Sequence, residues 1–566
     1  MDIQRIGLIA ALAIISYILV LTWQEDYGHK AQAVASAPVS SYSSAPDASS
    51  QSDSVAPVLN SAIPSSSDIP GSDEPAMEVA AIAAKPEQGG LVNVSTDTLD
   101  LVIDTYGGDI IHTALNDYLA QLNGDQALVL MEQNDNRTYT AQSGLTGQNG
   151  PDAKGDRPRY QVSQHSYQLA DGQDSLSVDL TLQQDNNVTI TKRFTFSRGQ
   201  YLIKMEYLID NQGDQSWQGN LFGQIKRDRS ADPSSQTSMG MQSYLGPAFS
   251  NADVNFEKIS FDDIDDAPYK SKSPAGWVAM LQHYFVSAWI PSPDQSHNYF
   301  ARERNGNYLA GFVSPSFTVA PSQQGSASAN FYAGPKIQGT LEQVAPFLKL
   351  SVDYGILWWI AQPIFWLLGV IQGVVINWGL SIILVTVAIK GLFFHLSAKA
   401  YKSMAKMRAV GPELTRLKEM YGDDRQKMSQ AMMELYKKEK INPLGGCLPI
   451  LIQMPVFISL YWVLLESVEL RHAPFMLWIQ DMSVMDPYFV LPILMGATMF
   501  IQQTLNPTPP DPMQAKVMKM LPFMFTFFFL WFPAGLVLYW VVNNILSIAQ
   551  QWVITRGIEA EVAARK

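Results

Sequence analysis

The chain has 566 residues, enough for several domains, and combines 47% hydrophobic residues with a formal net charge of −13. Its single cysteine, Cys447, excludes a disulfide within the chain. The sequence contains no serine-hydrolase, zinc-protease, P-loop or dinucleotide-binding motif, so we expect neither an enzyme nor a cofactor, and no direct nucleic-acid partner.

Charge divides the chain into two unlike parts. Residues 24–350 carry 37 acidic and 20 basic residues, whereas residues 351–566 carry 14 acidic and 18 basic residues. The first part is mostly polar, and the second contains long apolar runs. We therefore expect a multi-domain membrane protein in which an acidic, water-exposed part is joined to a basic, apolar part.

The N-terminus, residues 1–23, predicts a transmembrane anchor. Its apolar run is too long for a typical signal peptide, and the next Ala-x-Ala after it, Ala31–Ala33, lies well beyond its end. Arg5 precedes the run and acidic residues follow it, so the N-terminus is expected in the cytoplasm. Residues 24–90 are rich in Ser, Ala and Pro and predict a flexible linker, because they offer little apolar surface to bury.

Residues 91–350 predict an all-β domain. Apolar residues alternate with polar ones, for example from Leu176 to Leu182, and turn signals such as Asn186-Asn187 and Asn305-Gly306 separate the runs. A stretch of this length predicts a large β-sandwich. The acidic run at 262–266 is expected to be a solvated loop rather than a cation site.

Two apolar runs follow, and each is long enough to span a membrane. If both crossed, the basic segment 397–441 would lie on the same side as the β domain, against the preference of basic loops for the cytoplasm. We therefore predict that residues 351–373, rich in Trp, form an interfacial amphipathic helix and that residues 374–396 cross the membrane.

The segment 397–441 predicts a cytoplasmic helical hairpin with its turn at Tyr421–Asp424. Residues 398–440 hold 11 basic and 6 acidic side chains. The segment also carries flexible methionines, which suit a surface that accepts many apolar partners: Met404, Met407, Met420, Met428, Met432 and Met433. The alternative is that these methionines pack the hairpin while its basic face contacts anionic lipids.

Residues 442–553 predict transmembrane helices 3–6. Apolar runs at 444–465, 488–503 and 520–553 alternate with charged loops, and the last run is broken at Phe532–Gly535 into two short spans.

With the span at 374–396 these helices make a five-helix transmembrane core, and the anchor gives six spans. Residues 554–566 are then a cytoplasmic tail, because Arg and Lys close the chain.

Polar residues inside the predicted spans indicate a hydrophilic interior. Thr386, Lys390 and Ser397 would share one face of a continuous helix. Further polar or amphipathic positions lie in later spans: Gln453, Trp540, Asn543 or Asn544, Ser547 and Gln551. If these faces converge, the short helices enclose a wet groove.

Three alternatives remain open for these positions. Lys390 could extend its amine to the lipid phosphates. The Asn, Ser and Gln side chains could be hydrogen bonds between helices. A solute transporter would also contain polar spans, but it would usually show an internal repeat, and we find none.

Several motifs resemble the YidC membrane-protein insertases of Gram-negative bacteria, over essentially the whole chain. The matching stretches are Met404–Met407, Asn442–Cys447, Leu451–Pro455, Ser467–Arg471, Asp511–Gln514, Gly535–Tyr539 and, in the β region, Gly276–Leu281. The resemblance implies a periplasmic β-supersandwich and a hydrophilic groove that is open to cytoplasm and lipid but closed to the periplasm.

The resemblance also implies the activity and the partners. The family inserts and helps to fold membrane proteins in the bacterial inner membrane, alone or beside the Sec translocon and its accessory subunits. Implied partners are nascent membrane proteins, ribosome–nascent chain complexes and anionic lipids. The runner-up function is a membrane-anchored periplasmic module that binds a ligand or partner.

The candidate site residues form two groups. The first is a substrate groove made of Lys390, Thr386, Gln453, Trp540, Asn543 and Asn544. The second is a client-capture hairpin with Met404, Met407, Met420, Met432 and Met433. The sequence departs from the family at three positions, because Lys390 replaces the usual arginine, His395 the usual proline and Trp540 a common tyrosine.

Overall fold

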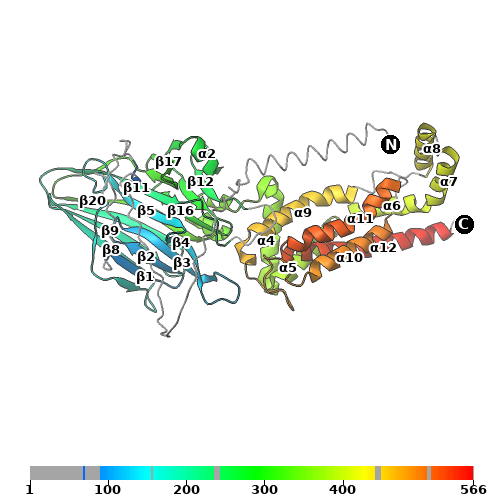
Figure 1. The fold of residues 1–566 in the computed structure, drawn as a ribbon, viewed down its shortest axis with the longest axis horizontal. Helices are drawn as coiled ribbons and strands as arrows, with labels where there is room; N and C mark the ends of the chain where they lie inside the picture. Colours follow the sequence, from blue (N-terminus) through cyan, green and yellow to red (C-terminus); the bar gives the residue numbers. More distant parts are fainter. Residues whose placement is uncertain are drawn as a thin grey trace, which may run out of the picture.

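The computed structural model describes residues 68–70, 90–153, 157–234, 243–422, 424–439, 448–506 and 512–564. The predicted anchor at 1–23 and the motif Asn442–Cys447 lie outside the described residues, as does most of the predicted linker. Figure 1 shows a β domain and a helical part arranged end to end along the long axis.

The β domain is a sandwich of two large sheets within the described residues. The first sheet has the order β14-β17-β18-β11-β5-β4-β3-β2-β1-β7, with β19 paired to β11. Its strands are β1 (Leu91–Ser95), β2 (Leu99–Asp104), β3 (Asp109–Leu119), β4 (Ala127–Gln133), β5 (Thr138–Thr146), β7 (Ser166–Gln168), β11 (Trp217–Arg227), β14 (Tyr269–Ser273), β17 (His297–Arg304), β18 (Asn307–Val313) and β19 (Phe317–Val319).

The second sheet has the order β13-β12-β15-β16-β20-β10-β9-β8-β6. Its strands are β6 (Gln161–Val162), β8 (Ser175–Gln184), β9 (Val188–Ser197), β10 (Leu202–Asn211), β12 (Gly246–Ser250), β13 (Glu257–Lys258), β15 (Trp277–Leu281), β16 (Phe285–Pro291) and β20 (Gln323–Pro335). The β-sandwich prediction is confirmed.

The predicted hairpins form where the turn residues allow them. Asn305 and Gly306 have φ values of 52° and 77°, and they join β17 to β18. Two successive positive φ angles match the twist of the flanking strands, and Gly and Asn adopt them at low cost. The acidic run at 262–266, predicted as a loop, instead lies in a short helix, α2 (Phe261–Asp266), because Ser260 caps its first turn.

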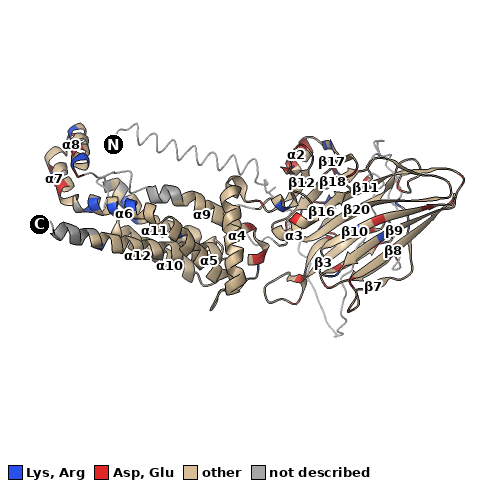
Figure 2. Ribbon diagram, turned by 180° about the vertical axis from the view of Figure 1, so that it is seen from behind, with Lys and Arg blue, Asp and Glu red and all other residues tan. Residues whose placement is uncertain are grey.

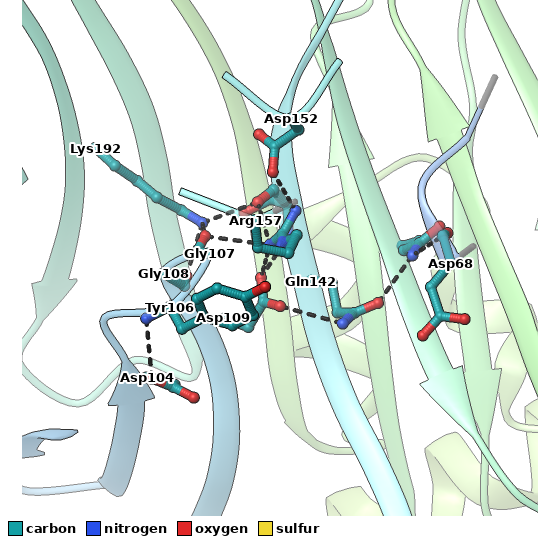
Figure 3. Close-up of polar contacts among 12 residues, drawn as sticks. Asp68, Asp104, Tyr106, Gly107, Gly108, Asp109, Gln142, Asp152, Arg157 and Lys192 are labelled. Atoms are coloured by element: carbon teal, nitrogen blue, oxygen red, sulfur yellow. Dashed lines mark hydrogen bonds and ion pairs between the residues drawn. The ribbon is translucent and has the colours of Figure 1, made fainter. Parts of the chain in front are cut away.

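A buried ion cluster links the β domain's loops to its core (Figure 3). Arg157 pairs with Asp152 at 2.7 Å and also with Asp109, and all three side chains are buried. Lys192 occupies an inward position of β9 and donates hydrogen bonds to the carbonyls of Gly107, Gly108 and Ser143. Burial lowers the pKa of Lys192 to about 7.

The helical part begins after the β domain. Its elements are α3 (Gln338–Val344), η2 (Leu348–Ser351), η3 (Gly355–Leu357), α4 (Trp358–Val375), α5 (Trp378–Leu392), α6 (Phe394–Ala409), α7 (Gly411–Tyr421), α8 (Arg425–Lys438), α9 (Leu448–Glu466), η5 (Val468–Leu470), α10 (Val490–Leu505), α11 (Pro512–Phe528), η6 (Phe529–Trp531) and α12 (Ala534–Ala564). Figures 1 and 2 show α4 running across the direction of α9, α11 and α12, at the end of the helices beside the β domain.

The prediction of one continuous helix through Lys390 and Ser397 is wrong, because the helix is interrupted after Leu392. The α5 helix ends there, and α6 leaves at an angle of 68°. The Phe393 amide reaches back to Gly391 and Ile389, which tightens the last turn, and glycine is a weak helix former. Ser397 therefore does not share a straight helix face with Lys390.

Other expected breaks are present. Asp424 caps α8 by accepting hydrogen bonds from the Gln426 and Lys427 amides, so the predicted hairpin turn is confirmed. The break predicted at Phe532–Gly535 is shorter than expected, because only Phe532 and Pro533 separate η6 from α12. The α12 helix continues past residue 553, so part of the predicted tail is helical.

Fewer helices than the six predicted spans are long enough to cross a membrane. Within the described residues, Gly355–Val375 and Ala534–Gly557 meet the length and composition required, and the bent α5–α6 pair would be a third. The α10 helix has 16 residues, about 24 Å against about 30 Å of hydrocarbon. Several helices fall short for this reason.

Buried polar contacts join the β domain to the helical part. His283 Nε2 lies 2.8 Å from the carbonyl of Leu465 in the last turn of α9. Lys336 Nζ lies 3.7 Å from a carboxylate oxygen of Glu466, with both side chains buried. A cation beside the C-terminal end of a helix is favourable, so this contact fixes how α9 meets the β domain.

Replacing Asp152 with Ala is expected to lower the free energy of unfolding of the β domain by about 3 kcal/mol or more, because it leaves the buried Arg157 undercompensated. The matched control is Asp179→Ala, which breaks the part-exposed pair with Arg193 at 2.7 Å and should cost less than about 1 kcal/mol. Native-state hydrogen exchange of β5 amides in the full chain measures both. Equal losses of stability in the two variants would contradict the larger contribution expected from the buried pair.

Glu469 in η5 should make stability depend on pH. Burial raises its pKa from 4.5 to about 7, so the folded state binds more protons than the unfolded state between these values. The folded chain is then expected to lose stability as pH rises through this window and to lose no more above it. Glu469→Gln should reduce this slope in thermal unfolding of the detergent-solubilised chain and leave the part due to Asp104, whose pKa burial raises to about 6. A slope identical in both chains would refute the assignment.

Candidate functional site

Lys390 lies in the last turn of α5, with 9% of its surface exposed. Its Nζ donates a 2.7 Å hydrogen bond to Ser547 Oγ on α12. The Ser547 hydroxyl in turn donates to the Asn543 carbonyl at 2.7 Å. Within the described part of the chain, no carboxylate pairs with Lys390. The amine is therefore a buried positive charge held by a neutral hydroxyl.

The α12 helix carries further polar contacts to its neighbours. Asn544 Nδ2 donates to Thr498 Oγ1 on α10 at 3.2 Å. Gln551 Nε2 donates to the Leu505 carbonyl and to Asn506 at the end of α10, both at 3.1 Å. These contacts lie between helices, so Asn544 and Gln551 act at least partly as interhelical hydrogen bonds.

Three predicted groove residues keep hydrogen-bonding capacity. Thr386 is buried and donates to the Ile382 carbonyl one turn back, at 2.6 Å, which leaves its oxygen lone pairs. The Nε2 of Gln453 is buried and has no hydrogen-bond partner among the described residues. The Asn543 side chain, half-buried on α12, likewise has no hydrogen bond to any described residue.

The Trp540 ring lies among aromatic side chains rather than among the polar residues. Its ring packs edge-on against Phe457 of α9, with centroids 4.3 Å apart, and also contacts Phe529 and Phe525. These aromatic rings join α9, α11, η6 and α12 into one packed cluster. Trp540 therefore stabilises the arrangement of the helices beside the polar residues.

The predicted client-capture hairpin is α7–α8 together with the end of α6. Met420 and Met433 are 57% and 53% exposed, and Met404, Met407 and Met432 are half-buried. Figure 2 shows Lys and Arg on α6 and α8, at the end of the molecule away from the β domain. An exposed, basic and methionine-bearing surface suits contact with apolar segments of other chains.

Two polar contacts near the candidate groove were missed in the sequence. Thr498 is the partner of Asn544, and Gln550 Nε2 donates to the Phe394 carbonyl at 3.1 Å, beside the bend between α5 and α6. Thr498 could have been noticed as a polar residue inside an apolar run. Gln550 could not, because its role depends on the bend.

The outer faces of these helices are apolar. On α5, Leu380, Leu384 and Val387 are exposed on the side away from the buried Thr386 and Lys390. The exposed apolar residues of α10 and α11 are Ile493, Leu494, Phe500, Ile501, Met513, Val517, Met520, Phe523, Met524, Phe527 and Phe528. Such a continuous apolar exterior is typical of helices that face lipid.

Known protein families match both the β domain and the helical part of the chain. The family described as YidC periplasmic domain matches residues 91–367, and the family described as 60Kd inner membrane protein matches residues 370–561. A solved structure titled "Active YidC insertase crystal structure with the first transmembrane domain resolved" is 17% identical, with a TM-score of 0.37. It covers 82% of this chain and 92% of its own.

Curated relatives match the full chain. Membrane protein insertase YidC of Pseudomonas fluorescens is 57% identical over 570 residues, covering 100% of this chain and 99% of the relative. Membrane protein insertase YidC of Pseudomonas syringae is 57% identical over 569 residues, with 99% of each chain covered. The chain therefore belongs to the YidC family of membrane protein insertases.

Proposed function

We propose that this insertase receives the polar end of its client in a groove built around Lys390. The protein inserts membrane proteins into the inner membrane, has a periplasmic β domain and acts without enzymatic chemistry. The observation that carries the proposal is the buried Lys390 amine, which no described carboxylate neutralises. A buried charge held only by Ser547 suits an acidic or polar segment supplied by a client.

The groove would lower the cost of moving a polar tail through lipid. Each unsatisfied backbone group in hydrocarbon costs several kcal/mol. Thr386, Gln453 and Asn543 have hydrogen-bonding capacity that lipid lacks, and Lys390 adds charge. Asn544 takes part through its contact with Thr498. Trp540 would support the groove through aromatic packing.

The client would arrive through the α7–α8 hairpin and leave towards lipid. Met404, Met407, Met420, Met432 and Met433 provide flexible apolar contacts for its hydrophobic segment. That segment then moves along α5 and α9 into the bilayer. Hydrophobic transfer, and the membrane potential acting on negative tails, supply the driving force.

The proposed topology places both termini in the cytoplasm and has six spans, of which α5, α9, α10, α11 and α12 form the core. The basic α6–α8 region lies at the opposite end of the molecule from the β domain, which supports a cytoplasmic position (Figure 2). The transverse direction of α4 and its exposed Trp358, Trp359 and Trp366 support an interfacial position. Short spans would thin the bilayer locally.

The proposed partners follow from these surfaces. Ribosome–nascent chain complexes would present clients to the basic hairpin, and anionic lipids would contact its lysines and arginines. The insertase would act alone or beside the Sec translocon and its accessory subunits.

Replacing Lys390 with Glu is expected to reduce insertion of a single-span client with an acidic tail by about tenfold, equal to about 1.4 kcal/mol, because like charges then meet in a poorly solvated site. A neutral-tailed client should be much less affected. Insertion into vesicles, scored by protease protection of the tail, measures both.

Two variants serve as controls for that experiment. Lys390→Arg keeps the charge and should retain most of the insertion, and Lys516→Glu makes the same charge change at an exposed lysine of α11, outside the hairpin, and should have little effect. Undiminished insertion of the acidic-tailed client by Lys390→Glu would rule out the electrostatic part of the proposal.

A further inference from the structure

Three residues of the predicted flexible linker are docked on the β domain. Asp68, Ile69 and Pro70 are buried, with exposed fractions of 3% and 4% for the first two. They belong to a Ser-, Ala- and Pro-rich stretch whose composition predicts no fixed structure. Burial of a short segment in such a sequence indicates that the surface beneath it recognises it.

The contacts are specific to peptide groups and to one carboxylate. Lys226 Nζ pairs with Asp68 Oδ2 at 2.6 Å, and Gln224 Nε2 donates to the Asp68 carbonyl at 3.0 Å. Arg302 donates to the carbonyls of Asp68 and Ile69 at 3.2 and 3.1 Å. The side chains of Lys226, Arg302 and Gln224 thus bind one acidic side chain and two consecutive backbone carbonyls.

The three donors belong to the regular sheet. Lys226 pairs in register with Leu309 on β18, and Leu309 pairs in register with Arg302 on β17. Residues paired directly across strands point to the same face, so Lys226 and Arg302 flank Leu309 on one side of the sheet. Gln224, two residues before Lys226 on β11, shares that face. Regular strands therefore set the spacing of the donors.

The Gln224 amide is held in position from the domain interior. Its Nε2 also donates to Gln142 Oε1 at 2.8 Å, and Gln142 donates to Asp109 at 3.1 Å. Figure 3 shows this path of hydrogen bonds running from Asp68 to the buried pair of Asp109 and Arg157. Because the core orients the amide, the donor group is pre-organised for its ligand.

We propose that Gln224, Lys226 and Arg302 form a peptide-recognition site for an acidic residue followed by an aliphatic residue, and that residues 68–70 fill it in cis. The site holds one point of the linker on the periplasmic domain. A segment in the same chain has a high effective concentration, so a peptide of the same chemistry added in trans competes with it. The proposal does not depend on the intramembrane groove.

The test uses the full chain in detergent and a fluorescent peptide with the sequence Ser-Asp-Ile-Pro-Gly, followed by anisotropy. The double variant Asp68→Ser, Ile69→Ser empties the site without altering the sheet. We expect it to bind the peptide at least about tenfold more tightly than the unaltered chain, because the competing segment is lost. Adding Lys226→Met should remove that gain, with hydrogen exchange of β11 amides checking that the sheet remains folded.

The matched control is Asp53→Ser, Ile63→Ser, which changes the same residue types elsewhere in the linker and should bind the peptide as the unaltered chain does. Equal peptide binding by the unaltered and emptied chains would overturn the proposal. Absence of binding to the emptied chain would also overturn it, since the site would then not recognise the segment by itself.

Carbodiimide labelling of carboxylates in the unaltered chain tests docking separately. Asp68 should react at least about tenfold more slowly than the exposed Asp171, because the Asp68 carboxylate is buried and paired. Lys226→Met should speed the reaction of Asp68. Equal rates for the two aspartates in the unaltered chain would contradict docking.

Discussion

A positive charge kept inside apolar helices is the constraint on which the helical part depends. Insertion scales assign about 2.5–3.5 kcal/mol to a lysine at the centre of a membrane helix. The structure meets part of this cost by packing α12 against α5, so that Ser547 accepts from Lys390. The remaining charge has no described carboxylate beside it, which is why we propose that the charge serves the polar end of a client.

In the β domain, by contrast, the charged side chains of the buried ion cluster lie beside carboxylates or several carbonyl oxygens. Arg157 lies between Asp109 and Asp152, and Lys192 is surrounded by carbonyl oxygens. Such dense hydrogen bonding favours a rigid scaffold rather than a binding site for a mobile chain. The scaffold then holds the end of α9 through His283 and carries the peptide site at Lys226.

Local sequence signals predicted the features that depend on neighbouring residues. Asn305-Gly306 forms a hairpin turn because both residues accept positive φ, and Asp424 marks the turn before α8 because its side chain caps the first turn of that helix. The polar faces of α5 and α12 were visible in the same way, through Lys390 and Ser547.

Features that depend on distant contacts could not be predicted. The bend after Leu392 is accompanied by a hydrogen bond from Gln550, more than 150 residues further along the chain. Docking of Asp68 depends on Arg302, which is more than 230 residues away. The environment of Trp540 follows from aromatic residues on three other elements, whereas the sequence showed only that its spacing places it on the same helix face as the polar residues of α12.

The most direct measurement of the central claim is photocrosslinking from Gln453. A photoreactive residue at this position, and at the exposed Ile493 of α10 as a control, would be tested with ribosomes stalled on a short, acidic-tailed client. The account predicts crosslinks from position 453 to the client's tail and none to the tail from position 493. Crosslinks from position 453 to neighbouring helices alone would mean that the polar residues only hold the helices together.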